Sequence, residues 1–436
     1  MNAIDNRITY SLLCNKILLQ YLDAKDKTEF SSTCKFIFQK CSRFRLSVYK
    51  FNLCDFVYYT NSIYSWIRSP EEIYNEQLEY INKIINIYRP HLLSLTCIKN
   101  ANYFILEYFS IQFDCLRSLF LNEFCIPQQT FKNVIDNLPN LHELVLIEIG
   151  VALELNNFSP TELKFPKYLT KFTMQYCYQF NCNHTDPVYL TLSGASLENT
   201  NRYNFEISNI NISRIKYLSW ANDYERGINT LNELLANNHK MEKLEVFLDR
   251  LNPSSLLLIS NNRNLNTLVL SAIENTVLKS YHFPKLPFVK RIELKDVFAP
   301  GMESIGLFLR NCPNLEELKF GFYTDNADIL LKIIKNFKNL KKLSITHMCL
   351  DLLLSAPFPE TTVEHLEFTT RDPFRTVFSV FNNLKHLKSV SLNGLFPLYN
   401  NYDYTNQLFD GYYYWREIRY SNSVKFWKTK QKLKIL

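Results

Sequence analysis

The feature that most constrains this chain is a short apolar pattern that recurs along most of its length. Each copy has an apolar residue, two variable residues, a second apolar residue, one variable residue and a third apolar residue. Side chains that alternate with a period of two are typical of a strand with one buried face. So many copies indicate similar units stacked around one shared core. Clear copies begin at Leu116, Leu141, Leu265, Leu315, Leu340 and Leu387, and weaker ones at Leu92, Leu169, Ile215, Met241, Val289 and Val363.

The copies from Leu92 to Leu387 recur about every 25 residues, a spacing within the range of leucine-rich repeats. We therefore expect an α/β fold, a leucine-rich-repeat solenoid with curved parallel strands on the concave face and helices on the convex face. The solenoid is expected to span residues 91–410 with about 13 units, one of them near Leu190. A last candidate copy begins at Trp415.

The segments between copies contribute the helical half of each expected unit. Phe131, Val134 and Ile135 lie on one helical face before Leu141. The family usually places Asn or Cys eight or nine residues after the first apolar position, where the side chain satisfies backbone groups in the turn. Residues that fit this position are Asn100, Cys125, Cys177 and Cys349, whereas other units carry residues such as Ile149, Val297 or Leu395. The repeats are thus degenerate, which predicts irregular curvature.

Residues 1–50 depart from the repeat. An amphipathic helix and a second short helix are expected there, separated by a break at Asp23–Asp26. The arrangement resembles an F-box, with Lys16-Ile17-Leu18, Tyr21-Leu22, Asp26 and Cys34-Lys35, although Tyr10-Ser11 stands where the family usually has Leu-Pro. The resemblance implies a small all-α module that binds a Skp-family adaptor. The expected helical pack and adaptor face comprise Leu12, Leu13, Ile17, Leu18, Leu22, Phe30 and Cys34.

The same segment has an alternative interpretation as a helical cap, because a solenoid needs a polar-faced end to prevent edge association. A separate cap is available in residues 51–90, which we interpret as a linker and a capping helix. Ser69-Pro70-Glu71-Glu72 is a helix start with a capping residue and proline at the first position. Residues 411–436 are expected to form a C-terminal cap and a basic tail, whose lysines are either solvated or a docking patch for an acidic partner.

Composition and motifs favour binding over catalysis. The net charge of +7 is mild for 436 residues, so nucleic acid is an unlikely partner. The 8 glycines form no phosphate-binding motif, and the 11 scattered cysteines suit reduced thiols of the cytosol or nucleus. We expect no membrane-spanning segment, no catalytic residues, no cofactor and no metal; Cys177, Cys182 and His184 lack the ligand set of a zinc site.

The side chains between the buried positions of each copy should face a ligand on the concave side. They change from apolar and aromatic in the early units to mixed charge in the later ones, and binding hot spots favour aromatics and arginine. We hypothesise that a target's apolar anchor docks on the first half and its charged flank on the second. The expected target-binding residues are Ile98, Phe120, Val145, Ile147, Tyr189, Tyr217, Phe247, Arg291 and Lys319.

The F-box resemblance implies the substrate-recognition subunit of an SCF-type ubiquitin ligase. The adaptor would connect the chain to a cullin scaffold, the repeats would hold the target protein, and ubiquitin transfer would occur on other subunits. Such a protein contributes by tethering, which raises effective concentration. Two alternatives are a leucine-rich-repeat scaffold with no ligase link and an enzyme with a site in residues 180–209.

Overall fold

A computed structural model of the chain describes the repeats but not residues 1–47, so the F-box-like residues Leu12 to Cys34 lie outside the described part. The described ranges are 48–52, 78–98, 103–154, 161–182, 202–204, 207–208, 212–221, 227–271, 283–297, 302–322, 332–346, 358–369, 381–393, 415–419 and 423–428, without residues 80, 84, 90, 163, 333 and 382. The chain divides into two compact units. The first comprises residues 1–215 and 222–230, and the second comprises 216–221 and 231–436.

In the first unit, parallel strands pair in chain order from β1 to β4. Strand β4 is long enough to pair with β6 along its first half and with β7 along its second half, both in parallel. Strand β8 then pairs with β7 in the antiparallel sense, and β5 and β9 form a separate parallel pair. The bounds are β1 (Val48–Asn52), β2 (Ser94–Ile98), β3 (Ser118–Pro127), β4 (Glu143–Glu154), β5 (Thr161–Glu162), β6 (Lys171–Gln175), β7 (Tyr178–Cys182), β8 (Arg202–Asn204) and β9 (Ile207–Ser208).

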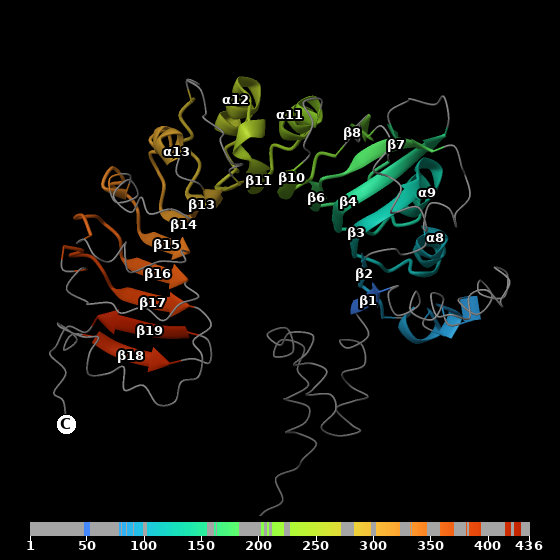
Figure 1. Cartoon of the computed structure of the whole chain (residues 1–436), viewed down its shortest axis with the longest axis horizontal. Helices are drawn as coiled ribbons and strands as arrows, with labels where there is room; N and C mark the ends of the chain where they lie inside the picture. The colour runs from blue at the N-terminus through green and yellow to red at the C-terminus, as the bar shows by residue number, and fades with distance from the viewer. Residues whose placement is uncertain are drawn as a thin grey trace, which may run out of the picture. The chain divides into compact units, whose positions relative to one another are not determined.

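In the second unit, the strands from β10 to β17 pair in parallel and in chain order (Figure 1). Each pairing joins equivalent positions of successive repeats, as Leu244 with Leu268 and Leu268 with Ile292 show. The bounds are β10 (Tyr217–Ala221), β11 (Lys243–Phe247), β12 (Thr267–Ser271), β13 (Arg291–Val297), β14 (Glu317–Phe322), β15 (Lys342–Thr346), β16 (His365–Thr369) and β17 (Ser389–Asn393).

The second unit ends differently from the repeat series. Strand β19 (Ser423–Lys428) pairs with β17 and with β18 (Trp415–Arg419), and both pairings are antiparallel. The sequence pattern predicted one more repeat strand at Trp415. The strand is present, but it does not continue the parallel order, because the chain turns back after β18 and β19 pairs between β17 and β18.

In both compact units, helices cover one face of the parallel strands (Figure 1). Their bounds are α8 (Tyr103–Gln112), α9 (Gln128–Asp136), α11 (Gly227–Asn237), α12 (Pro253–Asn261) and α13 (Met302–Leu309). Helix α12 begins where Asn252 accepts a 2.7 Å hydrogen bond from the Ser255 backbone N–H, with Pro253 at the first helical position. A helix was expected in every unit, but the described residues 164–170 and 283–290 hold turns before β6 and β13.

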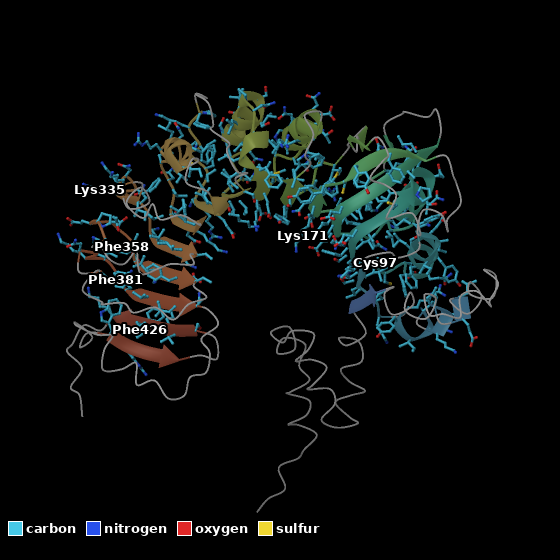
Figure 2. The ribbon with its side chains drawn as sticks, viewed as in Figure 1. Cys97, Lys171, Lys335, Phe358, Phe381 and Phe426 are labelled. Carbon is cyan, nitrogen blue, oxygen red and sulfur yellow. The ribbon has the colours of Figure 1, made fainter. Side chains whose placement is uncertain are left out.

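The core consists of the apolar positions of the repeat. The first, fourth and sixth residues of the copies are buried, for example Leu265, Leu268 and Leu270, and among the described ones only Leu392 and Ile418 are half-buried. Helical residues Phe131, Val134 and Ile135 close the core above β3 and β4. In the second unit, Phe358 packs edge-on against Phe368, and Phe381 stacks on Phe368. Figure 2 labels Phe358 and Phe381. Burying side chains of this size contributes about 1.5–3 kcal/mol each before entropy is counted.

In the first compact unit, three successive repeats share a kink that the sequence pattern did not predict. Glu123, Glu148 and Tyr176 occupy the same repeat position and have φ values of 57°, 54° and 54°. Non-glycine residues rarely adopt this left-handed conformation. The kinks turn the chain into a second parallel segment, which is why β3 and β4 are 10 and 12 residues long instead of five.

The chain is therefore an α/β protein with a large, open and mostly parallel sheet and few helices. Among the described residues, no helix is long and apolar enough to cross a membrane. Residues 81–83 and 85–88 of the expected capping helix are helical, and Ile81 and Ile85 are buried beside the first repeat.

Candidate binding face

The outward side of the strands, which we call the strand face, carries the side chains at the third, fifth and seventh repeat positions. The alternation is plain in β2, β11 and β16, where buried and half-buried residues alternate along the strand. All expected target-binding residues that the structure describes lie on this face and are half-buried or exposed. Tyr189 lies outside the described residues.

In the first unit, four of these residues form an apolar cluster on the strand face: Ile98, Phe120, Val145 and Ile147. Phe120 is in register with Val145, and Asn122 lies in register between Ile98 and Ile147. All four are half-buried. The cluster exists because three neighbouring strands place apolar residues at outward positions, where a strand with one solvated face usually carries polar ones.

In the second unit, the strand face carries a network of polar contacts, which includes Tyr217, Arg291 and Lys319. Phe247 lies on the same face and is half-buried. Arg291 lies 3.3 Å from Glu317, and Lys319 lies 2.8 Å from Glu293. In the first pair the cation is on β13 and the carboxylate on β14, and in the second pair the two are exchanged. Exposed pairs of this kind contribute little to stability. Their main effect is to hold the charged groups in place on the surface that a ligand would meet.

Glu245 is the centre of the most tightly connected part of this face. Its carboxylate accepts 2.6 Å hydrogen bonds from the Tyr217 hydroxyl and from Lys295 Nζ, 50 residues further along the chain. The ammonium of Lys243 lies 4.8 Å from the centre of the Tyr217 ring. Burial alone would raise the pKa of Glu245, but the hydrogen bonds from Lys295 and Tyr217 outweigh it and lower the pKa. The sequence did not single out Glu245 as a pairing partner, because Lys295 is two strands away.

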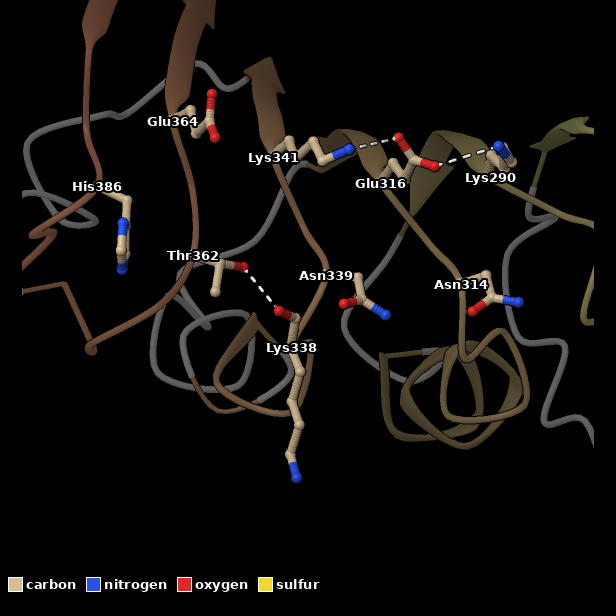
Figure 3. Close-up of a pocket in the computed structure, with 9 residues that line it drawn as sticks. All are labelled: Lys290, Asn314, Glu316, Lys338, Asn339, Lys341, Thr362, Glu364 and His386. Atoms are coloured by element: carbon tan, nitrogen blue, oxygen red, sulfur yellow. Dashed lines mark hydrogen bonds and ion pairs between the residues drawn. The ribbon is translucent and has the colours of Figure 1, made fainter.

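A second row of charges runs along the start of the strands, beside the hollow of about 590 Å³ in Figure 3. Glu316 lies between Lys290 at 3.3 Å and Lys341 at 3.0 Å, and both lysines lower its pKa. Asn314 and Asn339 donate to the carbonyls of Pro287 and Pro313 in the preceding unit.

The groups in this second row hold neighbouring repeats together. Backbone N–H groups at the start of each strand donate to the carbonyl of the preceding repeat, as Glu316 and Glu317 do to Lys290 at 2.8 and 2.9 Å. Most side chains that line the hollow are occupied by such links between neighbouring repeats. The start of the strands therefore joins neighbouring repeats and offers few groups to a ligand.

Among the described cysteines, three are buried, Cys125 is half-buried and Cys115 is exposed. Cys97, Cys177 and Cys312 are buried, and burial raises the pKa of each thiol to about 12. Cys177 lies 3.6 Å from the Leu146 carbonyl and 3.4 Å from that of Gln175, so it satisfies backbone groups as the repeat family expects.

Cys125 differs from that expectation. Its thiol lies 4.0 Å from the Tyr178 hydroxyl, and the repeat position equivalent to Cys177 is Phe124, one residue earlier. Asn100 and Cys349 lie outside the described residues. In the part of the chain that the structure describes, no three His, Cys, Asp or Glu side chains gather as a metal site.

Comparison with protein-family models and with curated proteins finds no match to this chain.

Proposed function

We propose that this protein is the substrate receptor of an SCF-type ubiquitin ligase built on a leucine-rich-repeat solenoid. Residues 1–50 would bind a Skp-family adaptor as an F-box, the adaptor would connect to the cullin scaffold, and the strand face would hold the target in the cytoplasm or nucleus. Ubiquitin transfer would occur on the other subunits, so the chain itself would need no catalytic residue or cofactor.

The observation that supports the proposal most is the regular register of the parallel strands. Equivalent residues of successive repeats lie side by side from β11 to β17. This arrangement places outward side chains in rows and makes an extended surface suited to a protein ligand. Aromatic residues on the strand face, Phe120 on β3, Tyr217 on β10 and Phe247 on β11, are the types that dominate binding energy in protein interfaces.

The adaptor half of the proposal rests on the F-box resemblance of residues 8–50 and has a direct test. The full-length chain and a variant lacking residues 1–50 are immobilised, and capture of a purified Skp-family adaptor is measured. We expect only the full-length chain to capture it. Circular dichroism and thermal unfolding of the truncated chain provide the control, because retained strand structure shows that lost capture is not lost folding.

If the full-length chain also fails to capture the adaptor, residues 8–50 are a helical cap. The second candidate function then applies, a leucine-rich-repeat scaffold with no ligase link. The presence of charge pairs and aromatics on the strand face supports this candidate equally, since it too needs a binding surface.

The target half of the proposal is tested on the strand face. Proteins captured by the full-length chain are compared with those captured by Phe120→Ala and Tyr217→Ala variants. Leu257→Ala is the matched control, because Leu257 is a similarly apolar residue that is 57% exposed on helix α12. We expect the two strand-face variants to lose the target and the control to retain it.

A further inference from the structure

A hollow of about 580 Å³ lies on the strand face between β16 and β19. Its floor is strand β17, whose residues Ser389 and Ser391 are in register with larger side chains on both neighbours. The walls are His365 and Glu367 on β16, and Trp427 and Lys425 on β19. The hollow is therefore a consequence of two serines on one strand and of the antiparallel return of β19.

The acidic group of the hollow is already neutralised. Glu367 accepts hydrogen bonds from Asn393 at 2.7 Å and from Ser344 at 3.0 Å, and it lies 3.0 Å from Lys342. Burial alone would raise the pKa of Glu367, but these contacts lower it, so the carboxylate is ionised at neutral pH and faces its own donors.

Lys425 has no such partner. Its ammonium lies 4.3 Å from the centre of the Trp427 ring, and no carboxylate of the described residues forms an ion pair with it. Two lysines against one glutamate leave the lining of the hollow with a net positive charge. Burial lowers the pKa of the neighbouring His365. Lys388, Lys425 and Lys342 lower it further, although Glu364 opposes them.

The remaining donors suit a tetrahedral anion. The hydroxyls of Ser389, Ser391 and Ser423 and the ammonium of Lys425 line one space, with His365 Nδ1 2.8 Å from Ser389 Oγ. A planar carboxylate is best matched by the two-pronged guanidinium of arginine, which is absent from this lining. A phosphate monoester instead offers three acceptor oxygens and up to two negative charges to several single donors.

We propose that this hollow binds the phosphate of a phosphorylated serine or threonine on a target protein. The inference rests on the proposed function, since it assigns the strand face to a protein ligand, and it deepens that function by naming the modification that the target carries. Lys425 would bind the phosphate, and the serine hydroxyls of β17 and β19 would donate to its oxygens.

The test uses the full-length chain and two degenerate peptide libraries that differ only in one fixed residue, phosphoserine or serine. Binding is measured by fluorescence anisotropy for the unaltered chain, for Lys425→Gln and for Ser391→Ala. Lys385→Gln is the matched control, because Lys385 is an exposed lysine outside the hollow whose partner is Glu360. Thermal unfolding of each variant checks that the sheet is retained.

We expect the phosphoserine library to bind at least tenfold more tightly than the serine library. Lys425→Gln should remove this preference, Ser391→Ala should weaken it severalfold, and Lys385→Gln should leave it unchanged. Equal binding of both libraries, an unaffected Lys425→Gln variant, or binding of inorganic phosphate without binding of the phosphoserine library would each overturn the proposal. Adaptor capture is measured separately, so phosphoserine preference without adaptor capture refutes the ligase role and leaves this site standing.

Discussion

Gly150 lies directly against the ring of Tyr178. A Cβ atom on Gly150 would lie 2.9 Å from Cζ of Tyr178 and 3.0 Å from Sγ of Cys125. These residues occupy one repeat position in three successive strands, in register across β3, β4 and β7. Only a residue without a side chain fits between the other two, just after the left-handed kink at Glu148.

We predict that Gly150→Ala destabilises the first unit by roughly 1–3 kcal/mol, the usual cost of overpacking a tight contact. Hydrogen exchange of peptides from β4 and β7 measures the effect locally. A double variant, Gly150→Ala with Tyr178→Ala, should recover part of the loss because the ring is removed. If the single substitution leaves exchange in β4 unchanged, the close approach does not constrain the fold.

The carboxylate of Glu245 predicts a dependence of stability on pH. Its folded-state pKa is lowered, so its stabilising contribution is fully present above the unfolded value of about 4.3 and is lost as pH falls through the folded pKa. We expect Glu245→Gln to cost about 1 kcal/mol at neutral pH, a value reduced for the partial exposure of the group.

Hydrogen exchange of β10 and β11 between about pH 5 and pH 3 checks this, after correction for the intrinsic rate. Opening of these strands should become easier as pH falls in the unaltered chain and should vary less in the variant. Glu79→Gln is the control, since Glu79 forms only an exposed pair with Lys83. Parallel pH profiles for the unaltered chain and Glu245→Gln would contradict the assignment.

Asn262 is a buried asparagine whose side-chain amide we expect the fold to require. Its side-chain amide donates at 3.2 Å to the Asn238 carbonyl of the preceding unit and accepts at 3.1 Å from the Asn264 N–H. We predict that Asn262→Ala costs about 1–3 kcal/mol, because the Asn264 N–H loses its acceptor and the Asn238 carbonyl keeps only its hydrogen bond from the Met241 N–H. Asn314→Ala should cost less, since Asn314 is exposed and water can replace its contact with Pro287. Urea unfolding followed by near-ultraviolet circular dichroism compares the two, and similar losses would refute the distinction.

The thiols predict a pattern of chemical reactivity. Cys115 is exposed, whereas Cys97, Cys177 and Cys312 are buried with pKa values raised to about 12. The thiolate is the reactive form, so iodoacetamide at pH 8 should label Cys115 first and the buried three only after denaturation. Peptide mapping by mass spectrometry gives the order. Early labelling of Cys97 would show that β2 opens readily.

Sequence and structure agree most closely at the inward positions of the repeat. Leu141, Leu144 and Leu146 are buried as the pattern predicts, and the same holds for copies as weak as Val363, Leu366 and Phe368. The expected strand-face residues also face outward, because inward and outward positions alternate once the strand is fixed. The F-box-like residues and Tyr189 stay predictions, since they lie outside the described residues.

The sequence by itself determined where the strands of the repeat copies lie and which of their faces is buried, because both depend on an apolar period that is local in the chain. Only the tertiary structure decided which side chains meet. The antiparallel return of β19 brings Lys425 beside Ser391, and Glu245 reaches Lys295 across an intervening strand. Such contacts depend on strand order, strand direction and side-chain size on neighbouring strands, and no local pattern in the chain records them.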